Sequence, residues 1–189
     1  MKGSDLVAKF LAERKIKYVF GIIGAGNAHI FDSIHNLGYT QIVCVHHEQA
    51  ACMAIQTFYR TRGEITAALL TTGAGSTNGI TGVVSAWADS IPGIIISGNE
   101  HFKYVSSHKN LRMWGVQGYD SSLMVEKVTK YAKRVESPNQ IMFELEKAYE
   151  IALDGRKGPC WIDIPMNVQS ENTIDGKEEK IEVINRSKR

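Results

Sequence analysis

The chain has 189 residues, which fits one domain, and a domain of this size buries roughly 70% of its unfolded surface. With 43% hydrophobic and 22% charged residues it is neither disordered nor fibrous, and no apolar run approaches the roughly 18 residues of a membrane span, so we expect no membrane association and a cytoplasmic location. The net charge of +2 comes from 22 basic and 20 acidic residues without a broad basic stretch, which excludes nucleic acid as an expected partner.

Helical and strand patterns alternate through the first half of the chain. Ser4 is placed to cap a helix whose apolar residues follow a 3.6-residue period, and a short strand over residues 18–20 ends at Gly21. The pattern then predicts a helix at 27–35, a strand at 41–45, a helix at 48–59, a strand at 66–70, a helix at 76–88 and a strand at 93–97.

The second half continues the alternation after a loop over residues 99–118. A fifth strand is predicted at 130–135, and the next helix, 138–153, opens with Ser137 as N-cap, Pro138 in the first turn and Gln140 completing a capping box. A sixth strand at 160–164 is stopped by a proline. We predict one domain over 1–168, and a linker or the start of a further, central domain over 169–189, where the chain turns polar.

Six strands alternating with helices indicate the α/β class. We predict a three-layer α/β/α fold with a six-stranded, mainly parallel sheet covered on both faces. The continuous apolar run at residues 94–96 supports this, because strands buried on both faces do not alternate. Ligands of such sheets bind at the carboxyl ends of the strands, where this chain carries glycines and polar residues at 21–26, 46–48, 71–78 and 98–99.

Two of these strand ends have alternative interpretations. Gly24 and Gly26 follow a strand as in a dinucleotide-binding turn, with Glu48 at the distance of a ribose-binding acid. The third glycine of that pattern is missing, because the residues in that region are His29 and Ile30. The turn at 71–78 could hold an anion on its backbone amides, although it lacks the Gly-Lys-Ser/Thr ending of a P-loop. Its glycines, serine and threonine equally suit a tight turn and a helix cap.

Glu48 starts a predicted helix directly after a strand. It could serve only to favour the helix dipole, or it could exchange a proton with a bound heterocycle. His46 and His47 are adjacent and point to opposite sides of an extended segment, and no Cys/His set has zinc spacing, so we expect no metal site made by this chain alone.

Together these features resemble the N-terminal pyrimidine-binding domain of thiamine diphosphate enzymes, in the acetolactate synthase family with benzaldehyde lyase and oxalyl-CoA decarboxylase. The resemblance runs from about residue 3 to residue 168. It rests on many motifs in the expected order: Val19-Phe20-Gly21, Phe31-Asp32, His47-Glu48-Gln49, Gly73-x-Gly75-x-x-Asn78, Thr81-Gly82, Asp89-x-x-Pro92, Gly98-Asn99, Gln117, Thr129-Lys130 and Gly158-Pro159.

The resemblance implies roles for particular residues. In that family the glutamate of the His-Glu-Gln motif bonds N1′ of the aminopyrimidine ring of thiamine diphosphate and so promotes deprotonation of the thiazolium carbon; Glu48 is the matching residue. Gly24 and Gln117 would lie against cofactor or substrate. The pyrimidine pocket would be shaped by Thr72, Gly73, Gly75 and Asn78. The implied reaction is decarboxylation or carboligation of a 2-oxo acid such as pyruvate.

The chain also departs from the synthases. Ile23 and Ala74 stand where prolines are usual, and Val116 and Gly118 flank Gln117 in place of Phe and Glu. Lyase or decarboxylase activity is therefore as consistent with the sequence as acetolactate formation is.

The family binds magnesium and diphosphate through a Gly-Asp-Gly motif that this sequence lacks. We therefore expect this chain to form half of the cofactor site and to be inactive without a diphosphate-binding domain, located in a longer chain or in a separate subunit. We also expect a homodimer. The alternative is a Rossmann-like nucleotide-binding module without catalysis.

Overall fold

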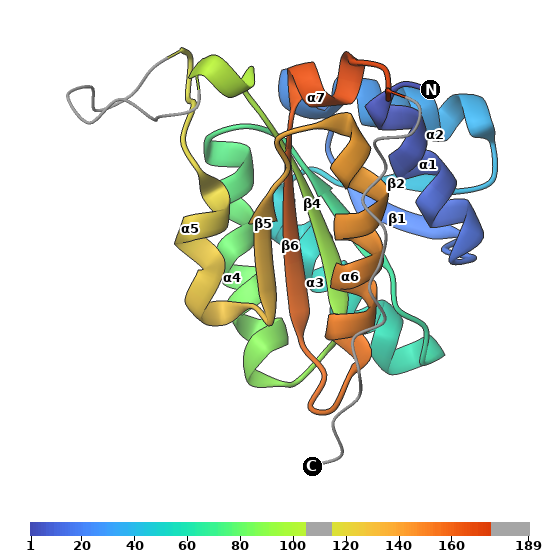
Figure 1. Cartoon of the computed structure of the whole chain (residues 1–189). Coiled ribbons are helices and arrows are strands. Elements are labelled where there is room, and N and C mark those ends of the chain that lie inside the picture. Colours follow the sequence, from blue (N-terminus) through green and yellow to red (C-terminus); the bar gives the residue numbers. More distant parts are fainter. Residues whose placement is uncertain (105–114, 175–189) are drawn as a thin grey trace.

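Six parallel strands form one sheet in the order β2-β1-β3-β4-β6-β5. The computed structural model describes residues 1–104 and 115–174, and Figure 1 shows the sheet between two layers of helices. This confirms the predicted three-layer fold, with every recorded strand pair parallel. The strands are β1 (Tyr18–Gly21), β2 (Gln41–Cys44), β3 (Ala67–Leu70), β4 (Gly93–Asn99), β5 (Tyr131–Arg134) and β6 (Pro159–Pro165).

Helices cover both faces of the sheet. One face carries α1 (Gly3–Glu13), α2 (Ala28–Leu37), α6 (Ile141–Leu153) and α7 (Met166–Ser170). The other carries α3 (Glu48–Arg62), α4 (Ala74–Ala88) and α5 (Ser121–Val125). Short 3-10 turns lie at Ala25–Asn27, Phe102–Tyr104, Glu126–Val128 and Pro138–Gln140.

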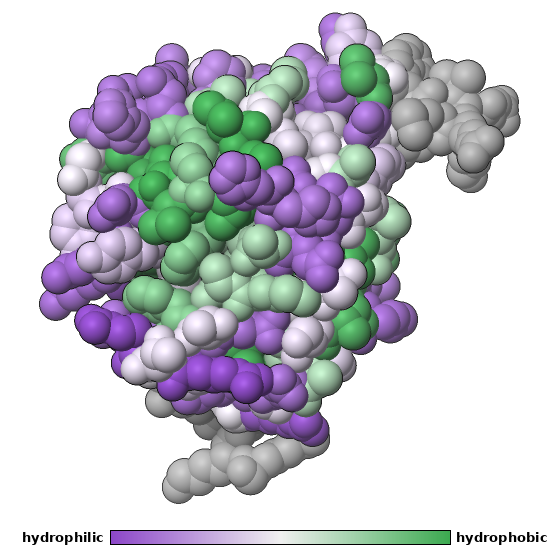
Figure 2. Space-filling view, turned by 180° about the vertical axis from the view of Figure 1, so that it is seen from behind, coloured by the Kyte–Doolittle hydropathy of each residue, from purple (hydrophilic) through white to green (hydrophobic). Residues whose placement is uncertain are grey.

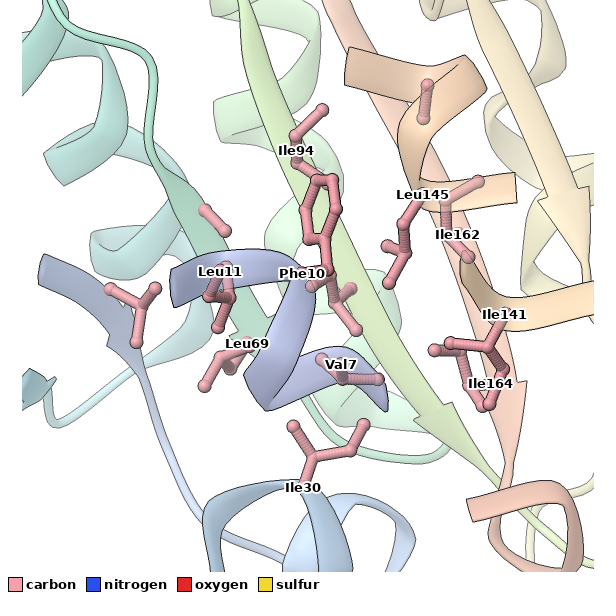
Figure 3. Close-up of a cluster of buried hydrophobic side chains, with 14 of the residues drawn as sticks. Val7, Phe10, Leu11, Ile30, Leu69, Ile94, Ile141, Leu145, Ile162 and Ile164 are labelled. Carbon is pink, nitrogen blue, oxygen red and sulfur yellow. The ribbon is translucent and has the colours of Figure 1, made fainter. Parts of the chain in front are cut away.

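The core has two parts because successive strand residues point to opposite faces. Leu69 and Ile94 belong to the larger cluster, where side chains of α1, α2 and α6 meet those of β3, β4 and β6 (Figure 3). Leu70 and Ile95 belong to the smaller cluster under α3 and α4. Each such large aliphatic side chain, fully buried, contributes about 1.5–3 kcal/mol.

The helix starts depart from the sequence predictions in detail. The first helix begins at Gly3 with Lys2 as N-cap, and the Asp5 carboxylate accepts a hydrogen bond from the Lys2 backbone N–H at 3.1 Å. Ser4 is buried and accepts a hydrogen bond from Ser33 Oγ at 2.8 Å, so its predicted capping role is wrong. Asp5, at the third helical position, instead reaches back with its side chain to the backbone of the N-cap residue.

The predicted start of the sixth helix is largely confirmed. Ser137 Oγ accepts a hydrogen bond from the Asn139 N–H, and Pro138 lies in the first turn. Gln140 Oε1 accepts from the Glu136 N–H at 3.2 Å rather than from Ser137, so the capping box is displaced by one residue.

Two short helices, α5 and α7, were not predicted because five residues are too few to show a period. The boundary predicted at residue 168 falls inside α7, where Gln169 is fully buried. Ile174 N–H donates to Asn139 Oδ1 at 3.1 Å, so residues 169–174 pack on the domain. Residues 175–189 of the predicted linker, and 105–114 of the predicted loop, lie outside the described residues.

Candidate functional site

The candidate site lies where the strand order reverses. Strand β1 pairs with β2 on one side and β3 on the other, and the helices that follow β1 and β3, α2 and α4, lie on opposite faces of the sheet. In open parallel sheets, ligands bind at this switch point outside the carboxyl ends of the strands. The loops after β1 and β3 therefore frame the site.

Glu48 enters this site from the start of α3. It is 8% exposed, and its Oε2 accepts a hydrogen bond from Asn78 Nδ2 at 3.0 Å. The two helices approach closely, because a Cβ added at Gly82 of α4 would lie 2.5 Å from Cys52 Cβ of α3. This close packing brings Asn78 to the carboxylate, and the carboxylate in the first turn of α3 also favours the helix dipole.

The turn between β3 and α4 is held by a second segment. Gly73 has φ 67°, which a residue with a side chain rarely adopts. Gln117 Oε1 accepts a hydrogen bond from the Ala74 N–H at 2.9 Å, and the Tyr119 hydroxyl donates to the Gly73 carbonyl. Because α4 begins at Ala74, the serine and threonine of the turn lie inside the helix and do not cap it.

The loop after β1 packs on the same turn. Gly24 N–H donates to Asn27 Oδ1 at 2.8 Å, and Gly26 N–H donates to Thr71 Oγ1 at 3.3 Å. A Cβ at Gly24 would overlap Thr71, and one at Gly26 would overlap Thr72. Among the described residues, Thr72 Oγ1 is buried without a hydrogen-bond partner.

This packing argues against the dinucleotide alternative. The glycines of that motif make room for a pyrophosphate, whereas Gly24 and Gly26 make room for threonines of the neighbouring loop. The strand order also differs from the 3-2-1-4-5-6 order of the dinucleotide-binding fold.

The structure brings most of the predicted site residues together. Glu48 lies beside Asn78 and Gly75, where a Cβ at Gly75 would be 3.0 Å from Glu48 Oε1 and 2.5 Å from Thr71 Cγ2. Gly24 also lies against Thr71. Gln117 contacts Gly73 and Ala74, and no recorded contact joins it to Glu48 within the described part of the chain.

Sequence reasoning singled out Thr72 and missed two neighbours. Thr71, not Thr72, is the threonine next to Gly75 and Gly24, although both belong to the polar strand end recognised in the sequence. Tyr119 had no sequence signal beyond its position two residues after Gln117. Burial raises the pKa of the Tyr119 hydroxyl, and the charge of Asp163 adds to this.

An open depression of about 670 Å³ adjoins the site. It is lined by Ala74, Thr77, Gln117, Tyr119, Asp120 and Met124. Glu48 is not among the residues that line it.

Two further groups of findings concern the parts of the chain described by the structure. Across residues 1–104 and 115–174, His, Cys, Asp and Glu side chains form no group of three or more that could hold a metal ion. In the same residues, none of the helices has the length and apolar character needed to cross a membrane.

Comparison with known proteins gives consistent matches. Residues 1–123 match the family described as thiamine pyrophosphate enzyme, N-terminal TPP binding domain. The chain is 34% identical over 172 residues to an acetolactate synthase large subunit of Haemophilus influenzae, covering 91% of this chain and 29% of the relative. It is 32% identical over 171 residues to the isozyme 3 large subunit of Escherichia coli, covering 89% and 28%. A probable acetolactate synthase large subunit of Methanocaldococcus jannaschii is 32% identical over 169 residues, covering 89% and 27%. The chain spans less than a third of the length of these relatives.

Proposed function

Because the chain belongs to the thiamine pyrophosphate enzyme family, matching its N-terminal TPP binding domain, we propose that Glu48 and the loops around it bind the aminopyrimidine ring of thiamine diphosphate. The observation that carries this proposal is the environment of Glu48. The carboxylate is nearly buried, yet Asn78 supplies the one hydrogen bond recorded to it among the described residues. A nearly buried carboxylate with spare acceptor capacity is suited to a ligand that donates to it.

Glycines let the segments around Glu48 approach one another closely. At Gly75 an added Cβ would lie 3.0 Å from Glu48 Oε1 and 2.5 Å from Thr71 Cγ2, so the glycine lets both side chains lie against the start of α4. Gly73 allows the turn whose first helical amide, that of Ala74, bonds Gln117. In the proposed role, Glu48 holds a proton at a ring nitrogen, Asn78 orients the carboxylate, and Gly24, Thr72, Gly73, Gly75 and Gln117 enclose the ring.

The proposed reaction is that of a 2-oxo acid. Bound thiamine diphosphate supplies an electron sink for breaking the bond next to a carbonyl. The relatives named acetolactate synthase support a decarboxylation followed by carboligation, and a lyase or decarboxylase reaction uses the same half-site. The residues of this chain contribute ring binding and proton transfer at Glu48.

We further propose that a diphosphate-binding domain, with its Mg²⁺, completes the site and that this chain alone is inactive.

A homodimer is also proposed. Figure 2 shows hydrophobic side chains gathered on the face covered by α3 and α4, where Met53, Val84 and Trp87 are 40–44% exposed. Apolar side chains gathered on one face are typical of protein interfaces. The cytoplasmic location stays a prediction.

Two buried glutamates allow a controlled test. We expect 4-amino-5-hydroxymethyl-2-methylpyrimidine, titrated into the ¹⁵N-labelled chain, to shift the amide resonances of Gly75 and Asn78 saturably. Glu48→Gln should weaken this binding about tenfold, because a hydrogen bond to a charged group contributes about 1.5–3 kcal/mol. The control is Glu144→Gln: Glu144 is 4% exposed and accepts a hydrogen bond from Tyr131 at 2.5 Å, but lies on the opposite face.

The assembled enzyme gives the second readout. With thiamine diphosphate, Mg²⁺ and the diphosphate-binding part present, Glu48→Gln should lower carbon dioxide release from pyruvate about 100-fold or more, which is the usual size of a proton-transfer contribution. If the pyrimidine does not bind, or if both glutamate variants weaken its binding equally, the proposal fails.

A further inference from the structure

Asp163 is a second buried carboxylate at this edge of the sheet. It lies on β6, is fully buried, and accepts three hydrogen bonds from described residues. Ser97 Oγ and Ser121 Oγ donate to Oδ1 at 2.5 and 3.0 Å, and Asn99 Nδ2 donates to Oδ2 at 2.7 Å. Two donors come from β4, but Ser121 comes from the start of α5.

The donors tie Asp163 to the segment of residues 117–121. Asn99 Nδ2 also donates to the backbone oxygen of Tyr119, at 2.8 Å. Ser121 Oγ, in turn, accepts a hydrogen bond from Trp161 Nε1 at 3.2 Å. The backbone of Tyr119 and the side chain of Ser121 are therefore both fixed to the carboxylate, one through Asn99 and one directly.

The same segment reaches the candidate site with its other side chains. Gln117 bonds the Ala74 N–H, and the Tyr119 hydroxyl donates to the Gly73 carbonyl. Residues 117–121 thus connect the Asp163 network to the turn between β3 and α4.

We infer that Asp163 is a positioning residue: through Asn99 and Ser121 it holds residues 117–121 so that Gln117 and Tyr119 remain on the turn at Gly73. A carboxylate is an expensive group to bury, and a close-packed apolar side chain would serve stability as well or better. The two carboxylate oxygens of Asp163 instead accept hydrogen bonds from β4 and from residues 117–121, which an apolar side chain cannot do.

The charged groups around the network are few in the described structure. Asp120, next to Ser121, lies 3.4 Å from Arg134 of β5 in an ion pair, and its charge acts on Asp163. Burial raises the pKa of Asp163 to about 6, and the three donors oppose this shift. The donors therefore reduce the cost of keeping the carboxylate in place.

Two serines provide a matched test. Ser97→Ala and Ser121→Ala each remove one buried hydroxyl that donates to the same oxygen, but only Ser121 belongs to the segment. Ser97→Ala also removes the 3.3 Å contact between the two hydroxyls, but it leaves the hydrogen bond from Ser121 to Asp163 in place. Measured by ¹⁵N relaxation of the whole chain, the order parameters of Gln117 and Tyr119 should fall from about 0.85 to below about 0.6 in Ser121→Ala and stay high in Ser97→Ala. Asn99→Ala, which breaks the bridge to Tyr119, should repeat the effect of Ser121→Ala. Amides of β3 and β4 should keep their order in all three variants.

Unchanged order of residues 117–121 in both Ser121→Ala and Asn99→Ala would overturn the inference, and so would an equal loss of order in Ser97→Ala. The consequence for the cofactor rests on the proposed function, whereas the relaxation measurement does not. If the pyrimidine binds the wild-type chain, Ser121→Ala should weaken it about threefold to tenfold and Ser97→Ala should not, since only the former releases Gln117. Failure of the pyrimidine to bind any variant would count against the proposed function alone.

Discussion

Glu48 and Asp163 are buried carboxylates at the same edge of the sheet, yet their surroundings differ. Asp163 is fully buried and accepts three hydrogen bonds from described residues. Glu48 is 8% exposed, has one recorded donor and faces a glycine. Saturated polar groups hold a structure together, whereas an unsaturated buried acceptor retains capacity for a ligand. The region around Asp163, with its acceptors satisfied, is called closed below, and the region around Glu48, which keeps acceptor capacity, is called open.

The largest expected effect concerns the closed region. Gly98, next to Asn99, has no room for a side chain, because an added Cβ would overlap the Gly26 carbonyl oxygen and lie 2.8 Å from Asn27 N. Gly98→Ala must displace backbone rather than a flexible side chain, so we expect a loss of about 3 kcal/mol in the free energy of unfolding. Urea denaturation measures it. A loss below about 1 kcal/mol would mean that this region is less closely packed than the structure indicates.

The next effect is the pH dependence of stability. The pKa of Asp163 is raised from 3.8 to about 6 in the folded chain, so between these values the folded state binds more protons than the unfolded state. The contribution of Asp163 to stability is therefore full below about pH 4 and decreases as pH rises through about 6. A shift of two pKa units corresponds to about 3 kcal/mol.

Asp163→Asn isolates this contribution from the other titrating groups. Asparagine keeps the shape and cannot ionise, and the serine hydroxyls can rotate to accept from its amide. The difference in unfolding free energy between the variant and the wild type should therefore grow in favour of the variant by about 3 kcal/mol from pH 4 to pH 7. A constant difference across this range would show that Asp163 does not titrate there.

The same contrast separates what the sequence could predict from what it could not. The buried strands follow from apolar runs such as residues 94–96. The position of Glu48 between a strand and an apolar helix left a structural and a catalytic role open, and the resemblance of His47-Glu48-Gln49 to a family motif favoured the catalytic one. Asp163 also interrupts an apolar strand, but its hydrogen-bond donors lie up to 66 residues away in the chain. A local sequence pattern therefore cannot predict that these donors contact Asp163. The predicted cap at Ser4 failed for a related reason, since Ser4 bonds Ser33, 29 residues away, instead of its own helix.

The smallest expected effect on stability belongs to the open region. In Gly75→Ala the new Cβ gains about 0.5–1 kcal/mol of helix preference but overlaps a methyl group of Thr71 at 2.5 Å, so the free energy of unfolding should fall by about 1 kcal/mol. The same Cβ lies 3.0 Å from Glu48 Oε1, so it should push the carboxylate away from the position proposed to bind the ring, and pyrimidine binding should weaken about tenfold or more. Gly79→Ala, one turn further along α4, is the matched control: its Cβ would meet Leu70 at 2.6 Å and Cys52 at 3.1 Å, which lowers stability without touching Glu48. Equal pyrimidine binding by the wild type and Gly75→Ala would mean that Glu48 does not bind the ring, and that the difference between the two carboxylates has a structural origin alone.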